Sequence, residues 1–149
     1  MKLKITTPDK VIFEGEITTV SLPTESGTET IHSKQSSPLV TAIKPGLLRI
    51  LTADQLHNTN DFVMAKNEIV ISIGKGMAFV DSTTIRVVAS QATTIPHLSK
   101  ENLEKNKQDI ENQIKKLRTE GSIEQIESYM TKLQKINADI SLEQIKECA

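Results

Sequence analysis

Cysteine, aromatic residues and long apolar runs are scarce in this chain of 149 residues. The single cysteine, Cys148, has no second cysteine in the chain to pair with, which suits a reducing compartment. No apolar run approaches the roughly 20 residues that a membrane-spanning helix needs, and the first residues lack the apolar core of a signal peptide. We therefore expect a protein that stays in the cytoplasm.

An excess of charge of one sign is also missing. The chain has 18 Lys and Arg against 19 Asp and Glu, with a formal net charge of −1. In the C-terminal third the basic residues alternate with acidic ones, and aromatic side chains that would stack on bases make up only 3% of the chain. This pattern argues against nucleic acid as a partner and favours protein.

Recognisable catalytic or metal-binding patterns are missing as well. The histidines His32, His57 and His97 stand apart, without cysteines or carboxylates at ligand spacing, so polar loop residues are a better interpretation than a zinc site. Gly74-Lys75-Gly76 lies between two expected strands and lacks a following helix, which favours a hairpin turn over a phosphate-binding loop. We assign no catalytic residue, no metal and no cofactor, and place an enzyme last among the possible functions.

Up to about residue 92 the chain consists of short, β-branched or alternating runs broken by turn residues, the pattern of strands. The links between the runs are short, so we expect antiparallel pairing and an N-terminal β-sandwich of about ten strands over residues 1–92. The expected strands are 3–6, 11–13, 17–22, 28–32, 39–43, 47–51, 61–65, 68–73, 77–81 and 84–89. Tight hairpins are expected at Pro8-Asp9, Glu14-Gly15, Lys44-Pro45-Gly46, Lys66-Asn67 and Gly74-Lys75-Gly76.

Residues 93–98 around Pro96 predict a linker, and residues 99–149 predict helices. Leu103, Ile110, Ile114 and Leu117 recur at helical spacing, and Gly121 marks a stop. A capping-box pattern at Ser122 then starts a second helix with its own apolar stripe. A link this short makes the two helices an antiparallel hairpin, so the fold class is α+β. The capping-box pattern occurs again at Ser141, before a short extra C-terminal segment that is either another helical turn or a frayed tail.

Three segments carry a family resemblance. Residues 5–17 place an apolar-Phe-x-Gly turn after the first strand, residues 37–50 contain Pro-Leu-Val-Thr-Ala-Ile-Lys-Pro-Gly, and residues 74–80 form a Gly-rich approach to the last strands. Together with the sandwich and the helical hairpin, they resemble the epsilon subunit of bacterial and chloroplast F-type ATP synthases, called delta in mitochondria. The resemblance spans almost the whole chain.

Two departures from the family pattern limit what the resemblance implies. Residues 30–39 lack the Gly and His that precede the Ala-Pro-Leu segment in most members, so the loop that faces the rotor ring in the family is expected to have a different shape. Many bacterial members also bind ATP through an (Ile/Leu)-Asp-x-x-Arg-Ala signature, where this chain has residues 98–103, Leu-Ser-Lys-Glu-Asn-Leu. Loss of the arginine removes bidentate phosphate contacts, so we expect little or no ATP binding.

The resemblance implies a non-catalytic central-stalk rotor subunit of a proton- or sodium-translocating ATP synthase, peripheral on the cytoplasmic face of the cell inner membrane. Its implied partners are the gamma subunit, the rotor ring of c subunits and the catalytic alpha/beta hexamer, with membrane association only through the complex. Outward-pointing residues of two strand segments are the expected partner surface: Glu29, Ile31, Pro38, Leu39, Met77 and Phe79.

The helical hairpin is expected to be a mobile arm that inhibits ATP hydrolysis, as in the family. Five basic residues are the candidates for contact with acidic surfaces of the catalytic subunits, and we call them the basic set: Lys115, Lys116, Arg118, Lys132 and Lys135. Plain solubilisation of the helix surface is the alternative role for them. The alternative for the whole chain is a free-standing β-sandwich adaptor with a helical protein-binding arm.

Overall fold

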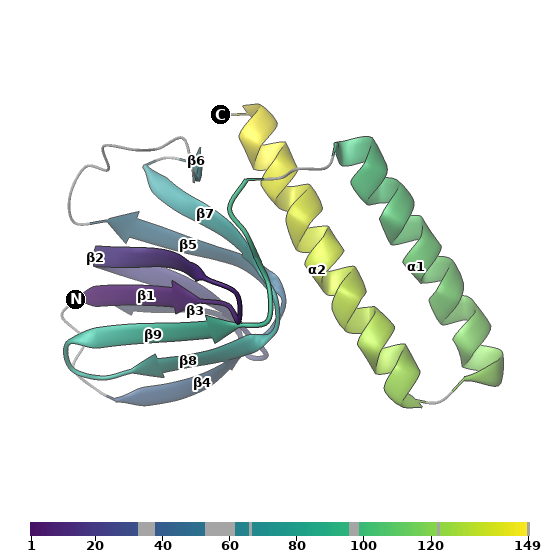
Figure 1. Ribbon diagram of the computed structural model, residues 1–149, viewed down its shortest axis with the longest axis horizontal. Helices are drawn as coiled ribbons and strands as arrows, with labels where there is room; N and C mark the ends of the chain where they lie inside the picture. Colours follow the sequence, from purple (N-terminus) through teal and green to yellow (C-terminus); the bar gives the residue numbers. More distant parts are fainter. Residues whose placement is uncertain (33–37, 53–61, 66, 96–98, 122, 149) are drawn as a thin grey trace.

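The computed structural model describes residues 1–149 except 33–37, 53–61, 66, 96–98, 122 and 149. An N-terminal sandwich of strands is followed by two antiparallel helices, as the sequence predicts, and the α+β fold class is confirmed. Helix α2 (Ile123–Cys148) lies between the sandwich and α1 (Lys100–Glu120), so α1 is the outermost element (Figure 1).

The described residues form ten strands in two layers, and eight of these strands make one continuous hydrogen-bonded path. Their order is β1-β9-β8-β4-β2-β5-β7-β10, with β3 paired to β2 and β6 to β7. All pairings are antiparallel except that of β1 with β9. The strands are β1 (Lys2–Thr6), β2 (Val11–Thr24), β3 (Gly27–His32), β4 (Leu39–Ile43), β5 (Gly46–Thr52), β6 (Val63–Ala65), β7 (Glu68–Ile73), β8 (Gly76–Val80), β9 (Thr84–Ala89) and β10 (Ala92–Thr93).

Strand β2 belongs to both layers. Its first half pairs with β1, its second half pairs with β3 and β5, and the register shifts between Ile17 and Thr19. The expected turn at Glu14-Gly15 is therefore wrong: both residues lie inside β2, opposite Lys4 and Leu3 of β1. A bulged strand bends enough to pass from one sheet of a sandwich to the other, which removes the need for a turn.

Two of the other expected hairpins are also wrong. The links at Lys44-Pro45 and Gly74-Lys75 are short, but the strands on either side of each do not pair with each other. Each link instead carries the chain from one layer to the other, because β4 and β8 pair in one sheet and β5 and β7 pair in the second. The hairpin at Pro8-Asp9 is confirmed by the Thr7 N–H, which donates to Lys10 O at 2.9 Å.

The hairpin between β6 and β7 is confirmed by the pairing of these strands and by Asn67, whose φ of 68° lies in the left-handed region that asparagine tolerates. Lys66, the other residue expected in this turn, lies outside the described residues. Beyond the expected strands, β10 extends the sheet to Thr93 by pairing with β7, so sheet pairing continues past the expected end of the sandwich at residue 92.

The core lies between the two layers and is almost entirely aliphatic. It follows from alternation along the strands: in β9, Ile85, Val87 and Ala89 point inward while Thr84, Arg86 and Val88 point outward. The residues that pack together in the core are Leu3, Ile5, Phe13, Ile17, Val20, Leu22, Ile31, Ile43, Leu48, Ile50, Ile69, Ile71, Ile73, Ala78, Val80, Ile85, Val87 and Ala89.

The helices begin and end close to where the sequence places them. Ser99 caps α1 by accepting a hydrogen bond from the Asn102 N–H at 3.3 Å, and the Gly121 N–H donates to Leu117 O at 2.7 Å at its end. The segment after Ile140, left open between another turn and a frayed tail, continues α2 without a break to Cys148. Among the described residues, no helix has the length and apolar character to cross a membrane.

Candidate interaction surfaces

The outward face of the sheet that contains β4, β8, β9 and β1 carries an apolar strip. Cross-strand pairing places Ala42, Met77, Val88, Thr6 and Val11 side by side in one row. The large apolar members are strongly exposed: Val40 at 62%, Val11 at 50%, Val88 at 42% and Met77 at 38%. We define the apolar strip as Val11, Val40, Ala42, Met77, Phe79 and Val88.

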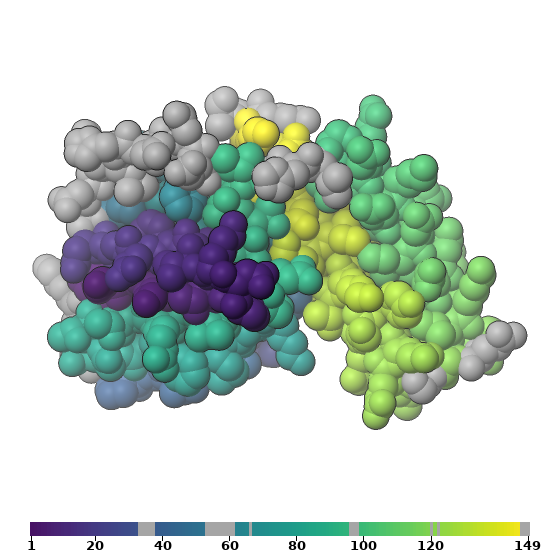
Figure 2. Space-filling view, in the orientation of Figure 1, coloured from purple at the N-terminus to yellow at the C-terminus, as the bar shows by residue number. Residues whose placement is uncertain are grey.

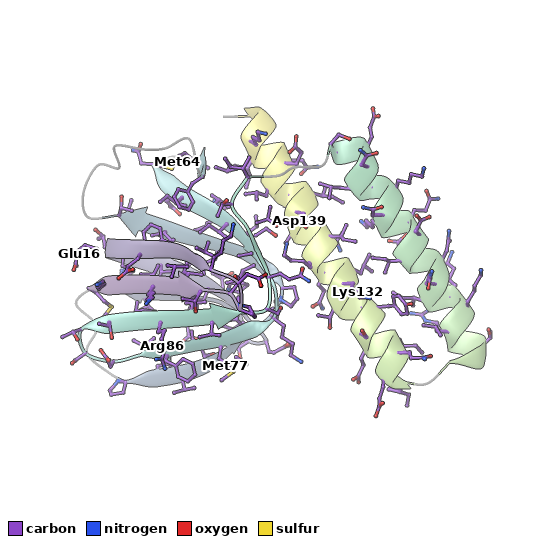
Figure 3. All side chains as sticks on the ribbon, viewed as in Figure 1. Glu16, Met64, Met77, Arg86, Lys132 and Asp139 are labelled. Atoms are coloured by element: carbon purple, nitrogen blue, oxygen red, sulfur yellow. The ribbon has the colours of Figure 1, made fainter. Side chains whose placement is uncertain are left out.

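Charged residues border the apolar strip in the neighbouring row. Arg86 pairs with both Phe79 and Lys4, and its guanidinium lies 5.0 Å from the centre of the Phe79 ring. Further along, Lys2 bonds to Glu14 at 3.1 Å, and this contact is the main cause that lowers the pKa of the Glu14 carboxyl. Figure 2 shows part of this face, with the N-terminal strands beside β8 and β9, and Figure 3 labels Met77 and Arg86. An apolar centre with a charged border is typical of protein–protein interfaces.

A hollow of about 240 Å³ lies at one end of the apolar strip. Its lining includes Val40, Phe79 and Arg86 together with Asp81, which follows β8. The Asp81 carboxylate accepts hydrogen bonds from the Thr83 and Thr84 N–H groups at 2.9 and 2.7 Å. These bonds, with one from the Thr84 hydroxyl, lower the pKa of Asp81 to about 2. The β8–β9 turn beside the strip is thus held in one conformation by a carboxylate.

The structure brings two of the six predicted partner residues together. Met77 and Phe79 both lie in the apolar strip. Leu39 is half-buried and packs against the core, and Ile31 is 2% exposed because its side chain points inward between Thr30 and His32, so we leave both out of the surface. The remaining two are Glu29, half-buried on β3 of the other sheet, and Pro38, exposed before β4.

Sequence reasoning missed Val11, Val40 and Val88 as surface residues. For Val88 a signal was available, because it lies between two residues, Val87 and Ala89, that alternate with it and are buried. Which of the two faces is buried depends on the second sheet, however, and strand alternation alone does not show where that sheet lies.

The outward face of the second sheet is covered by the protein's own helix. Helix α2 packs on β5, β6 and β7. Leu142 is fully buried there against Val63 and Val70, with partly buried residues around it: Leu47, Ala65 and Ile145. Strand β7 is consequently buried on both faces, since Ile69, Ile71 and Ile73 point into the core.

Four polar side chains complete the contact between α2 and the sandwich, and we call them the polar cluster: Ser72, Thr93, Lys135 and Asp139. The Lys135 ammonium lies 2.6 Å from Asp139 Oδ1 and donates to the Thr93 hydroxyl at 3.1 Å. The Ser72 hydroxyl donates to the same Asp139 oxygen at 2.6 Å. The side chains of Lys135 and Asp139 are only 10% and 18% exposed, and Figure 3 shows Asp139 on the side of α2 that faces the sandwich.

The sequence contains a signal for the polar cluster that we did not use. Ser72 interrupts the apolar run of β7, and it is 0% exposed. A buried hydroxyl needs a hydrogen-bond partner, so a polar residue inside an apolar strand indicates a polar contact from another element. Lys135 and Asp139 stand four residues apart on α2, the spacing of an ion pair along one helix face.

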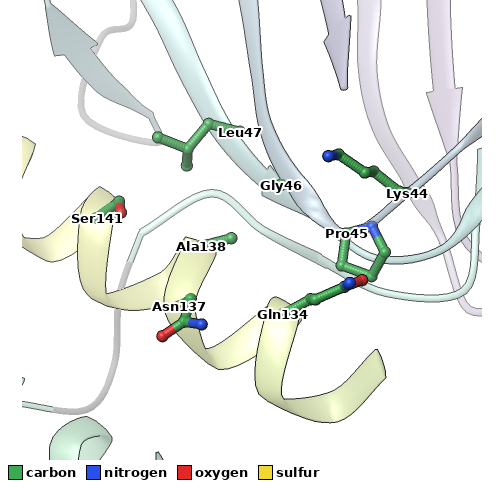
Figure 4. Close-up of a pocket in the computed structure, with 8 residues that line it drawn as sticks. All are labelled: Lys44, Pro45, Gly46, Leu47, Gln134, Asn137, Ala138 and Ser141. Atoms are coloured by element: carbon green, nitrogen blue, oxygen red, sulfur yellow. The ribbon is translucent and has the colours of Figure 1, made fainter. Parts of the chain in front are cut away.

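Next to the polar cluster, the Lys44-Pro45 link approaches α2 without filling the space between them. Figure 4 shows the open hollow of about 290 Å³ between this link and the residues of α2 that face it. Polar and apolar residues contribute equally to its lining: Lys44, Pro45, Gly46, Leu47, Gln134, Asn137, Ala138 and Ser141. The helix thus packs on β5, β6 and β7 but leaves this hollow beside the link.

The basic set divides into exposed and buried members. Lys115, Lys116, Arg118 and Lys132 are exposed. The Lys132 ammonium lies 5.0 Å from the centre of the Tyr129 ring. Lys135, by contrast, is 8% exposed inside the polar cluster, so it cannot meet a partner while α2 is docked.

No group of three or more His, Cys, Asp and Glu residues that could hold a metal ion occurs in the part of the chain that the structure describes. His32 is exposed on β3, while His57 and His97 lie outside the described residues. The two candidate surfaces of the described residues are the apolar strip on one sheet and the helix-covered face of the other.

Comparison with known proteins points to one family. The family profile described as "ATP synthase, Delta/Epsilon chain, beta-sandwich domain" matches residues 1–95. The ATP synthase epsilon chain of Mycoplasma mobile is 30% identical over 141 residues, which cover 95% of this chain and 91% of that protein. The epsilon chain of Delftia acidovorans is 30% identical over 126 residues, covering 85% and 83%.

A solved structure shares the fold. A chain in the cryo-EM structure of the mitochondrial ATP synthase of Euglena gracilis superposes with a TM-score of 0.69, covering 91% of this chain and 76% of that one. The sequence identity between the two is 14%, so this likeness concerns the arrangement of the elements alone.

Proposed function

Because the chain belongs to the ATP synthase delta/epsilon family, we propose that it is the non-catalytic central-stalk rotor subunit of a proton- or sodium-translocating F-type ATP synthase. The structural observation that supports this role is the contrast between the two sheets of the sandwich. One sheet is covered by helix α2 and the other leaves the apolar strip open. An uncovered apolar face of this kind calls for a protein partner.

The proposed occupant of the apolar strip is the gamma subunit. Val40, Met77 and Val88 supply the apolar centre, and Arg86 and Lys4 supply charges at its border. The rotor ring of c subunits is proposed to meet the end of the sandwich near Pro38. The loop 33–37 next to it, expected to have a shape of its own, lies outside the described residues. The subunit then sits on the cytoplasmic face of the inner membrane, held there by the complex.

The helical hairpin is proposed to be the regulatory arm. In the docked arrangement, Lys115, Lys116 and Arg118 already face solvent on α1. If α2 leaves the sandwich, Lys135 becomes available too, and the whole basic set is free to meet acidic surfaces of the alpha/beta hexamer. Such a contact would brake ATP hydrolysis. The test is truncation after Pro96 in the assembled complex, which should raise ATP hydrolysis clearly; unchanged hydrolysis with intact coupling would leave the hairpin a structural element.

A pull-down from membranes tests the proposed assembly. The tagged chain should bring down the gamma subunit and the catalytic hexamer, whereas a free-standing adaptor would bring down neither. Met77→Glu places a charge in the apolar strip and should abolish the recovery of gamma, because an unpaired charge in an apolar interface is strongly unfavourable. Thr28→Glu, an exposed site on β3 of the other sheet, is the matched control and should leave recovery unchanged. Equal recovery with both variants would remove the apolar strip as the gamma contact.

A further inference from the structure

The contact between α2 and the sandwich has an apolar part and a polar part. Leu142 is fully buried against Val63 and Val70 in the apolar part. In the polar part, Asp139 lies about one helical turn before Leu142 and bonds to Ser72 of the sandwich. Lys135 lies one further turn back along α2 and bonds to Thr93. The part of the contact that is buried and polar is therefore carried by one ion pair and two hydroxyls.

The polar cluster defines where α2 can sit. Ser72 and Thr93 are direct cross-strand partners on β7 and β10, so their side chains stand next to each other. Neighbouring strands lie about 4.8 Å apart, and residues four apart on a helix are separated by about 6 Å along the axis. Lys135 and Asp139 thus match the spacing of Thr93 and Ser72 in one position of the helix. A shift of α2 by one turn would leave the ammonium and the carboxylate without these hydroxyl partners.

The same polar cluster weakens the docked state relative to an apolar contact. Removing an ammonium and a carboxylate from water is costly, and their mutual attraction roughly offsets that cost, so a buried ion pair adds little net stability. Removing one member alone is different, because the remaining charge stays buried without its counter-charge. Both side chains are largely shielded from solvent here, so this asymmetry applies to them.

We propose that the polar cluster is a release latch. It holds the helical hairpin in one register on β7 and β10 while keeping the docked state weak enough to open. This inference rests on the proposed function, since a release latch has a purpose only if the hairpin works as a mobile arm. It also gives Lys135 a role distinct from the rest of the basic set: it holds the docked arm and becomes a surface charge only after release.

The inference predicts opposite effects of single and paired substitutions. Lys135→Met or Asp139→Ala alone leaves one charge buried, so the undocked fraction should rise about tenfold to a hundredfold. The pair Lys135→Met with Asp139→Leu, made in a Ser72→Ala background so that no buried hydroxyl loses its partner, replaces the ions with apolar side chains of similar size. This double variant should be docked as fully as the unaltered chain or more so.

The measurement is single-molecule energy transfer in the isolated full-length chain. Dyes on Thr28→Cys in β3 and Lys116→Cys in α1, both exposed sites, report the distance between the sandwich and the outer helix in a Cys148→Ser background. Leu142→Ala, which removes the buried apolar anchor, gives the signal of the undocked state. Lys132→Met is the matched control on the exposed part of the same helix and should not change the docked fraction.

The outcomes separate the possibilities. Opening by both single variants and recovery in the double variant support the release latch. If the double variant is undocked as often as the single variants, the ion pair is simply a stabilising contact. If the single variants match Lys132→Met, the polar cluster has no influence on docking. Either result overturns the inference. Because this experiment uses the isolated chain, failure of the pull-down would refute the proposed function while leaving the result on the latch unaffected.

Discussion

The Ser72 hydroxyl donates a 2.6 Å hydrogen bond to the carboxylate of Asp139, a residue 67 positions further along the chain. Ser72 stands in the middle of a strand whose other described positions are mostly apolar, and Asp139 stands on the helix that covers it. This bond joins the sandwich to the hairpin, so its removal should affect docking more than it affects the sandwich itself.

Ser72→Ala tests that expectation. Loss of the hydroxyl should destabilise the docked hairpin by about 1–2 kcal/mol, since hydrogen bonds to charged groups contribute about 1.5–3 kcal/mol and Asp139 keeps its bond to Lys135. Hydrogen exchange of the α2 amides measures the change. Ser21→Ala, which removes an exposed 3.1 Å contact with Thr30, is the control and should have little effect. Equal exchange of α2 in the two variants would contradict the prediction.

Gly76→Ala should destabilise the sandwich. A Cβ at this position would lie 2.1 Å from the Val88 carbonyl oxygen and 2.8 Å from the Ala89 Cα, so β8 and β9 would have to move apart. We expect a loss of about 1–3 kcal/mol in the free energy of unfolding, measured by urea denaturation. At Gly15 the nearest atoms are those of the Phe13 ring, at 3.5 Å, so Gly15→Ala is a matched control that should be tolerated. Similar losses in both variants would show that close backbone approach is not the cause.

Asp81 should make the β8–β9 turn sensitive to acid. Its pKa in the folded chain is about 2, below the value of 3.8 expected without these hydrogen bonds. A lowered folded pKa means that the carboxylate contributes stability above about pH 4, and that this contribution is lost as the pH falls toward 2. An NMR titration of the Asp81 carboxyl measures the pKa directly. Asp81→Asn should flatten the acid dependence of stability in this range, whereas Asp109→Asn on the polar face of α1 serves as the control for removing one charge.

ATP should not bind the isolated chain. The residues that stand where the resemblance would place the Asp, Arg and Ala of an ATP signature are different, and the described part of that segment, Ser99 to Leu103, serves as a helix cap and a first turn. ATP at millimolar concentration should therefore leave the melting temperature unchanged, because a ligand stabilises a protein only in proportion to its binding. A saturable upward shift would contradict this prediction.

Much of the fold followed from local patterns. Strand alternation located nearly all the strands, the change in composition at residue 99 and the stop at Gly121 marked the two ends of α1, and the apolar stripes predicted a helical hairpin. These features depend on residues that are close in sequence, where backbone preferences and the period of the apolar residues act directly. The family resemblance could also be found from the sequence, because the motifs that carry it are continuous segments of the chain.

The hairpins at Lys44-Pro45 and Gly74-Lys75 show where local patterns fail. A short link does not reveal whether the next strand pairs with the last one or crosses to the facing sheet, because both arrangements bring consecutive strands close together in space. Val40 and Val88 illustrate the same limit for the site, since the period of a strand defines two faces but not which of them is covered.

The sequence by itself determined the elements, their order and the family, because each depends on neighbours along the chain. Only the tertiary structure decided which faces stay open and which are covered. Helix α2 docks on β7 and thereby buries Ser72 and Lys135, whereas neither of the two described helices docks on the sheet that carries Met77. Which face is covered depends on contacts between residues far apart in sequence, such as Ser72 with Asp139. These contacts form, and stabilise the protein, only once the sandwich and the helical hairpin have come together.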